Sequence, residues 1–133
     1  MYSRTTTTKS GISTQHTFGP NALKQTIEIW LSSDQESVKL NFATRDRRGV
    51  AASLVGVAGV AVVQDQFVQA AQLLGAVGKL LNEIAAHLYL DDQREYELHL
   101  ESVQKQLDVP TLNRAWAEGQ SMTMEQAVTF ATS

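Results

Sequence analysis

The chain has 133 residues, of which 43% are hydrophobic and 19% charged, a balance typical of one soluble globular domain and unlike a disordered chain. Its net charge of -3 at pH 7 argues against a general affinity for nucleic acid phosphates or for an anionic membrane surface. The absence of cysteine excludes disulfides, thiolate zinc sites and cysteine nucleophiles, and it fits the cytoplasmic location that we expect.

Residues 1–19 are rich in Ser, Thr and Gly and show no hydrophobic periodicity. They lack the continuous apolar core of a signal peptide, so we interpret them as a flexible arm preceding a helical domain at 20–133. That domain is predicted to open with an amphipathic helix over 21–33. In the next stretch, 36–43, apolar residues alternate as in a strand, but no partner strand is visible and we prefer a second helix.

The segment 50–63 contains fourteen uncharged residues and raises three alternatives: a membrane span, a buried strand or a buried helix. It is shorter than the roughly 20 apolar residues that a membrane helix needs. Its valines favour a strand, yet fourteen residues is long for a strand, and Ala52, Gly56 and Gly59 recur at helical spacing. We therefore predict a buried helix whose small residues let a neighbouring helix approach closely.

The segment 67–86 is predicted to be an amphipathic helix, because its apolar residues recur in steps of three and four. These residues are Phe67, Ala70, Ala71, Leu74, Val77, Leu80, Leu81 and Ile84. Only residues 64–66 separate this helix from the preceding one, and so short a connection predicts an antiparallel hairpin.

Three further helices are predicted downstream. The first has Asp91 or Asp92 as its N-cap, and the second begins at Pro110 and ends at Gly119. The third begins after Thr123, with Gln126 completing a capping box. Its predicted buried side consists of Met124, Ala127, Val128 and Ala131.

With the hairpin in place, residues 54–77 resemble a tetratricopeptide repeat, a helix pair whose stacking buries a shared core. The packing positions of that repeat correspond to Leu54, Val57, Ala58 and Ala61 in the first helix and to Phe67, Ala70, Leu74 and Val77 in the second. Asp65 stands where the repeat usually has glycine. The resemblance implies an all-α fold of tetratricopeptide-like antiparallel hairpins, and the predicted segments add up to about seven helices.

Four stretches taken in order resemble the C-terminal helical tail of large bacterial multidomain transcriptional regulators, which couple a signalling ATPase to tetratricopeptide repeats. They are "ESVKLNFATRDRRGVA", "AAQLLGAVGKLLNEI", "REYELHLESVQKQL" and "AWAEGQSMTMEQAVTFA". The likeness covers about residues 36–132. It implies a sensing or scaffolding role and carries over no catalytic residue. The ATPase and a recognisable helix-turn-helix are absent from this chain.

Several motifs with possible chemistry have a simpler structural interpretation. "GAVGKLL" departs from a phosphate-binding loop, which needs glycine in place of Leu73 and Ser or Thr in place of Leu80. Glu95 and His99, with His87 twelve residues before His99, offer too few ligands for zinc, so no metal or cofactor is expected.

Two clusters of charge are likewise assigned structural roles. The acidic residues between 91 and 101 are interpreted as a solvated helix face, because no pocket-lining pattern surrounds them. "RDRR" at 45–48 is interpreted as a hairpin-entry turn with ordinary ion pairing.

The sequence therefore predicts a non-catalytic helical interaction module. A short helical stack leaves a terminal apolar face that binds a partner helix or a second copy, and a homodimer is the expected assembly. No direct contact with nucleic acid or membrane is expected. The residues expected at this face are Leu23, Ile27, Trp30 and Leu40.

The alternative is a small-molecule sensor with an apolar pocket between the hairpin and the last three helices. The candidate lining residues of this pocket are Leu74, Tyr96, Trp116 and Met124.

Overall fold

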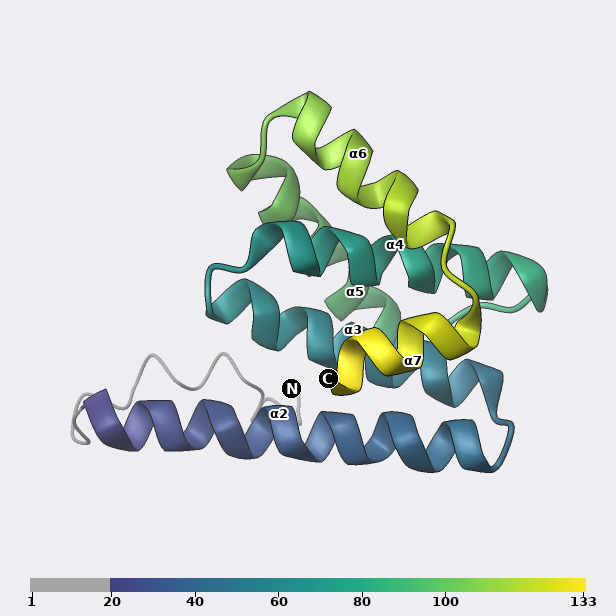
Figure 1. Ribbon diagram of the computed structural model, residues 1–133, viewed down its shortest axis with the longest axis horizontal. Helices are drawn as coiled ribbons and strands as arrows, with labels where there is room; N and C mark the ends of the chain where they lie inside the picture. Colours follow the sequence, from purple (N-terminus) through teal and green to yellow (C-terminus); the bar gives the residue numbers. More distant parts are fainter. Residues whose placement is uncertain (1–19) are drawn as a thin grey trace. The chain divides into compact units, whose positions relative to one another are not determined.

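The computed structural model describes residues 20–133, with side chains from Lys24 onward, and the predicted arm at 1–19 lies outside the described residues. Through residues 20–133 the chain forms six α-helices and no strand, which confirms the all-α fold class (Figure 1). The helices are α2 (Pro20–Ala43), α3 (Arg47–Val63), α4 (Phe67–Glu83), α5 (Leu90–Gln106), α6 (Val109–Gln120) and α7 (Met124–Thr132). The chain divides into two compact units, residues 1–30 and residues 31–133, and the hydrophobic core lies in the second.

The helix count differs from the predicted seven because the first two predicted helices are one. α2 is continuous for 24 residues and includes the stretch 36–43, where alternating apolar residues resembled a strand. After Pro20, which suits the first position of a helix, α2 contains no proline or glycine to interrupt it. The Ser–Ser–Asp sequence at 32–34, although poor in helix propensity, is tolerated inside it.

The turns after α2, α3 and α4 each contain a residue other than glycine in the left-handed backbone conformation. The φ angle is 62° at Arg45, 60° at Asp65 and 52° at Ala85. After Asp65, the Gln66 N–H donates to the carbonyl of Ala61 at 2.8 Å, and the other two turns repeat this bond to a carbonyl five residues back. This Schellman pattern satisfies carbonyls that a helix end leaves open. Asp65 thus has the backbone conformation that glycine favours at this turn.

The predicted capping box of α7 is confirmed. The Thr123 hydroxyl accepts from the Gln126 N–H at 3.0 Å, and the Gln126 side chain accepts from the Thr123 N–H at 2.9 Å. Asp46 caps α3 in the same way, its carboxylate accepting from the Gly49 N–H at 2.9 Å. Asp108 caps α6, with Pro110 in the first turn as predicted.

Three predicted helix ends are wrong. α4 ends at Glu83 and not at residue 86. α5 begins at Leu90 with Tyr89 at the N-cap position, so Asp91 and Asp92 lie inside its first turn. Their carboxylates interact favourably there with the positive end of the helix dipole. α6 continues through Gln120, so Gly119 does not terminate it.

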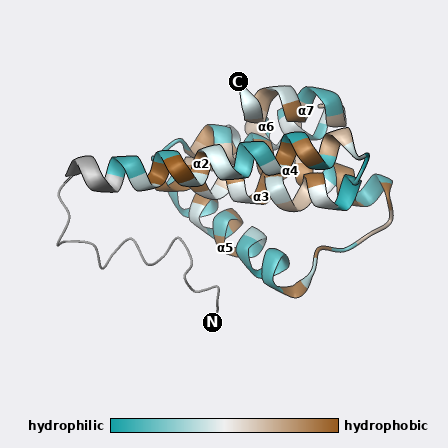
Figure 2. Ribbon diagram, turned by 90° about the horizontal axis from the view of Figure 1, so that it is seen from below, coloured by the Kyte–Doolittle hydropathy of each residue, from teal (hydrophilic) through white to brown (hydrophobic). Residues whose placement is uncertain are grey.

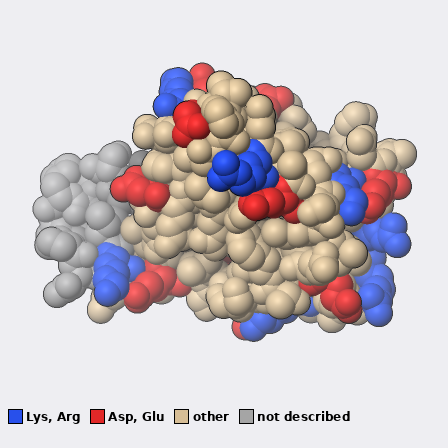
Figure 3. Space-filling model, turned by 45° about the horizontal axis from the view of Figure 1, so that its top comes forward, with Lys and Arg blue, Asp and Glu red and all other residues tan. Residues whose placement is uncertain are grey.

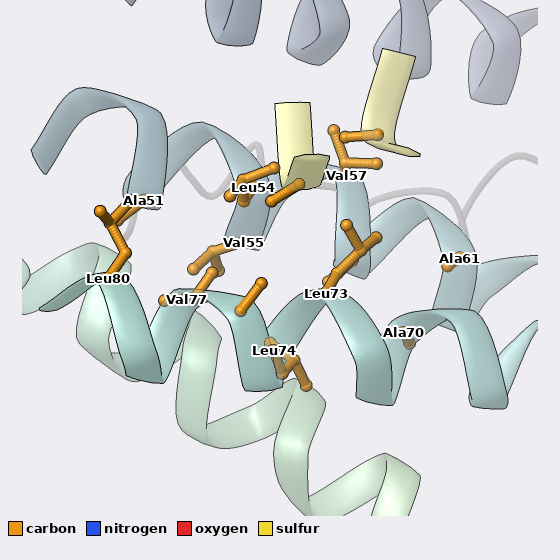
Figure 4. Close-up of a cluster of buried hydrophobic side chains, with 14 of the residues drawn as sticks. Ala51, Leu54, Val55, Val57, Ala61, Ala70, Leu73, Leu74, Val77 and Leu80 are labelled. Atoms are coloured by element: carbon orange, nitrogen blue, oxygen red, sulfur yellow. The ribbon is translucent and has the colours of Figure 1, made fainter. Parts of the chain in front are cut away.

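The core of residues 31–133 is built on the hairpin of α3 and α4, joined only by residues 64–66 (Figure 1). The valine-rich segment is the helix that we predicted, and it is buried on almost all sides. Side chains of the two helices interdigitate between their axes (Figure 4). The largest fully buried side chains are Leu54, Leu73, Leu74, Val38, Val50, Val55, Val60, Val77 and Val103. Burying each of these stabilises the fold by about 1.5–3 kcal/mol.

α4 is the helix around which the others assemble, because α3, α5, α6 and α7 all contact it. α5, a mostly hydrophilic helix (Figure 2), crosses both members of the hairpin and buries only Val103 completely. None of the helices in residues 20–133 is both long enough and apolar enough to cross a membrane.

The closest packing is between α4 and α6. A β-carbon added to Gly119 would collide with the backbone of Gln72, and one added to Gly75 would lie 2.6 Å from the Trp116 carbonyl oxygen. Gly119 is therefore required for the approach of the two helices. The Gln120 side chain donates to the carbonyl of Gly75 at 2.7 Å and fixes this crossing.

Candidate functional site

A groove of about 680 Å³ opens on the surface between the end of α6 and α7. Its lining residues are Glu118, Ser121, Met122, Glu125, Gln126, Thr129 and Phe130. Met122 and Phe130 are half-buried and give the groove an apolar part, while Glu118 and Glu125 are exposed carboxylates. The lining contains no Lys or Arg, so the groove combines an apolar surface with negative charge.

Glu118 occupies a position that helix stability alone does not favour. It lies in the last turn of α6, where the negative end of the helix dipole disfavours a carboxylate by about 0.3–1 kcal/mol. Its Oε1 atom accepts a hydrogen bond of 2.7 Å from the side-chain amide of Gln72, which holds the carboxylate beside the groove. Lys79 of α4 donates from Nζ to the carbonyl of Met122 at 3.0 Å, but the carboxylate that it pairs with is Glu83 of its own helix, not Glu118 or Glu125. The groove therefore suits a positively charged group.

A second hollow, of about 410 Å³, lies where the end of α4 faces α5. Its lining residues are Gly78, Leu81, Asn82, Ala85, Ala86, His87, Gln93 and Tyr96. Burial raises the pKa of Tyr96 above its ordinary value. Its phenol is protonated at neutral pH, as in any tyrosine, and can donate a hydrogen bond. This hollow presents amide, imidazole and phenol groups and no carboxylate, Lys or Arg.

The glycines of α3 receive polar side chains from two other helices. A β-carbon on Gly56 would lie 2.8 Å from Asp34 Oδ1 of α2, and one on Gly59 would lie 2.6 Å from His99 Nε2 of α5. The small-residue row predicted a close approach, and the structure shows that side chains, rather than a helix backbone, make it. Because Gly56 and Gly59 are neighbours on one helix face, Asp34 and His99 pack against the same side of α3.

The residues predicted for a terminal apolar face lie along α2. Leu23 is in this helix, but its side chain lies outside the described residues. Ile27 and Trp30 are half-buried and belong to the unit of residues 1–30. Leu40, in the unit of residues 31–133, is 64% exposed.

Two of the four residues predicted for a pocket meet at Gly78. Around the position of a β-carbon on Gly78, Tyr96 Oη lies at 3.4 Å and Trp116 Cζ2 at 3.5 Å, and Tyr96 also lines the second hollow. Leu74 is fully buried in the core, and its side chain lies on the side of α4 that faces away from α3 (Figure 4). Met124, the first residue of α7, is half-buried and lines neither the groove nor the second hollow.

The motifs that were given structural interpretations are part of the packing. Gly75 and Gly78 of "GAVGKLL" lie inside α4, and Gly75 packs against α6. In the first turn of α3, Arg48 lies 5.0 Å from the centre of the Tyr89 ring, a cation–π contact where the sequence predicted ordinary ion pairing. No group of three or more metal-ligating side chains occurs in the described part of the chain.

Sequence reasoning missed the groove and most of the second hollow. Glu118 gave a usable signal, because an acidic residue in the last turn of a predicted helix opposes the helix dipole. Asn82 and Gln93 gave none, since isolated amide residues on a helix surface are common.

The chain matches no known protein family, no curated protein and no solved structure.

Proposed function

We propose that the protein is a non-catalytic helical interaction module whose acidic groove between α6 and α7 binds a segment of a second copy of the chain. The observation that carries the proposal is the pairing of Glu118 and Glu125 with the half-buried Met122 and Phe130 in one groove. A partner segment that fits has an apolar side chain for the groove and Lys or Arg beside it.

The charge distribution along the chain favours a second copy as the partner. The first 27 residues contain three basic residues, Arg4, Lys9 and Lys24, and no acidic residue, whereas the remainder contains fourteen acidic and eight basic residues. Ile12 and Phe18 supply apolar side chains in the same segment. Such opposite charges in two parts of one chain favour association between copies.

Other features support an interaction role. Charges of both signs are interspersed on the face shown in Figure 3, which favours a local charged contact over the broad basic surface that nucleic acid binding uses. The resemblance to the tail of bacterial multidomain regulators implies a sensing or scaffolding part, and we propose tetratricopeptide-like stacking of the α3–α4 hairpin in that context.

Sedimentation equilibrium of the full chain tests this proposal. The wild-type protein is expected to form dimers, and the double variant Glu118→Lys/Glu125→Lys is expected to weaken dimerisation at least about 10-fold, because repulsion replaces attraction. The matched control is Glu36→Lys/Glu97→Lys, which makes the same charge change at exposed residues outside the groove. A wild-type chain that remains monomeric at the highest concentration, or equal weakening by both variants, contradicts the proposal.

A further inference from the structure

We propose that the hollow between α4 and α5 is a separate binding site for a small uncharged molecule with an amide-like edge, in which an N–H donor and a carbonyl acceptor lie side by side. No residue lines both this hollow and the α6–α7 groove. The proposal is therefore independent of the interaction role argued above, and either can fail without the other.

The lining of the hollow selects against charged ligands. It contains no Asp, Glu, Lys or Arg, and its one imidazole, that of His87, belongs to an exposed residue. A charged group entering the hollow loses hydration and gains no lining carboxylate, Lys or Arg as a partner. A neutral polar molecule loses less hydration energy on entering and forms hydrogen bonds with the lining in return.

The polar groups of the lining match an amide-like edge. The side chain of Asn82 has a donor and an acceptor side by side, so it can form two hydrogen bonds with such an edge. Gln93, a lining residue, donates through Nε2 to Glu97 Oε2 at 3.0 Å, and its Oε1 can accept a hydrogen bond from a ligand. The protonated Tyr96 hydroxyl adds a donor.

Side chains rather than the end of α4 carry this recognition. The backbone carbonyls of Leu80, Leu81 and Asn82 already accept hydrogen bonds from the N–H groups of residues 84–86. The helix end therefore closes on itself, and the side-chain amides and the phenol are left to specify the ligand.

The apolar part of the hollow suits a small flat ring. Gly78, Leu81 and Ala86 give an apolar surface, and Trp116 Cζ2 lies 3.5 Å from the position of a β-carbon on Gly78. At about 410 Å³ the hollow lies within the range of small-molecule sites. A planar ring that carries an amide edge can contact the apolar surface with its face and form hydrogen bonds with the polar side chains through its edge.

The test is a titration of the full-length protein followed by backbone NMR, with uracil and nicotinamide as probes. Uracil carries the amide edge within its ring and nicotinamide carries it outside, so binding of either supports the proposal and identifies the preferred form. The matched ligand control is dimethyluracil, in which methyl groups replace both N–H hydrogens, and the charged control is orotate. The probes are expected to shift the amide signals of Gly78, Asn82 and Gln93, and the controls are expected to leave them unchanged.

Two variants link the binding to the lining residues. Asn82→Asp removes the amide donor and adds a charge, and Tyr96→Phe removes only the hydroxyl; each is expected to weaken binding about 5-fold. The matched controls are Asn113→Asp and Tyr89→Phe, at exposed residues outside the hollow. The proposal is overturned if neither probe shifts the lining signals, if dimethyluracil binds as tightly as uracil, or if the control variants weaken binding equally.

Discussion

Gly75 and Gly78 are three residues apart in α4, but their surroundings differ. A β-carbon on Gly75 would lie 2.6 Å from the backbone oxygen of Trp116, which cannot move without shifting α6. A β-carbon on Gly78 would meet only side-chain atoms, the nearest being Gln120 Nε2 at 3.3 Å. One glycine is therefore required for helix packing, and the other leaves room beside a hollow.

This difference predicts unequal effects of alanine on stability. Gly75→Ala is expected to lower the free energy of unfolding by about 1–3 kcal/mol, because the added methyl group overpacks a backbone contact. Gly78→Ala is expected to change it by no more than about 1 kcal/mol, because the helix preference of alanine offsets the crowding of Gln120 Nε2 at 3.3 Å. Urea denaturation followed by circular dichroism measures both. Equal losses in the two variants contradict the packing described for α4 and α6.

The sequence assigned both glycines to helix packing but could not distinguish them. The spacing of small residues indicates that a helix face is closely approached. It does not indicate whether the approaching atoms belong to a backbone or to a side chain. For Gly56 and Gly59 the approaching groups are the side chains of Asp34 and His99, whose positions depend on how α2 and α5 pack on α3.

At the scale of helices, the sequence predicted best where local chemistry decides the outcome. The turn between α3 and α4 and the capping box at Thr123 were predicted because both depend on a few adjacent residues. The break expected within α2 was wrong, since weak helix formers are tolerated where no proline or glycine interrupts the chain. The start of α5 at Leu90 was missed because its N-cap, Tyr89, makes no side-chain hydrogen bond to mark it.

The cap of α6 predicts a specific dependence of stability on pH. The pKa of Asp108 is lowered because its carboxylate accepts hydrogen bonds from the Thr111 hydroxyl at 2.8 Å and from the Thr111 N–H at 3.1 Å. Because the pKa is lower in the folded than in the unfolded state, the cap stabilises fully above the ordinary Asp value of about 3.9, and this contribution is lost as the pH falls through the folded pKa.

Thermal unfolding of Asp108→Ala between pH 7 and pH 3 checks this dependence. The variant is expected to be less stable than the wild type at pH 7, with a difference that narrows below about pH 4. Asp108→Asn keeps a capping oxygen but does not titrate, so it serves as the comparison. A difference between Asp108→Ala and the wild type that stays constant over this range would show that the carboxylate charge is not involved.

At the scale of the whole molecule, the sequence predicted the central hairpin but not what covers it. Periodicity placed Leu74 and Val77 in a helical core, and both are fully buried. The packing of α6 on α4 could not be predicted, because it depends on backbone approach at Gly75 and Gly119. The groove between α6 and α7 and the hollow between α4 and α5 arise from this arrangement.

The proposal that an acidic groove receives a basic segment of a second copy has its most direct test in a charge exchange. One chain carries Glu118→Lys/Glu125→Lys and the other carries Arg4→Glu/Lys9→Glu. Each variant alone has groove and N-terminal segment of like charge and is expected to be monomeric, whereas in a mixture each N-terminal segment meets a groove of opposite charge.

Sedimentation equilibrium of the two variants, separately and mixed in equal amounts, gives the decisive masses. Monomers in the separate samples and heterodimers in the mixture are the predicted result. A mixture that stays monomeric, or separate variants that dimerise as the wild type does, would contradict the account.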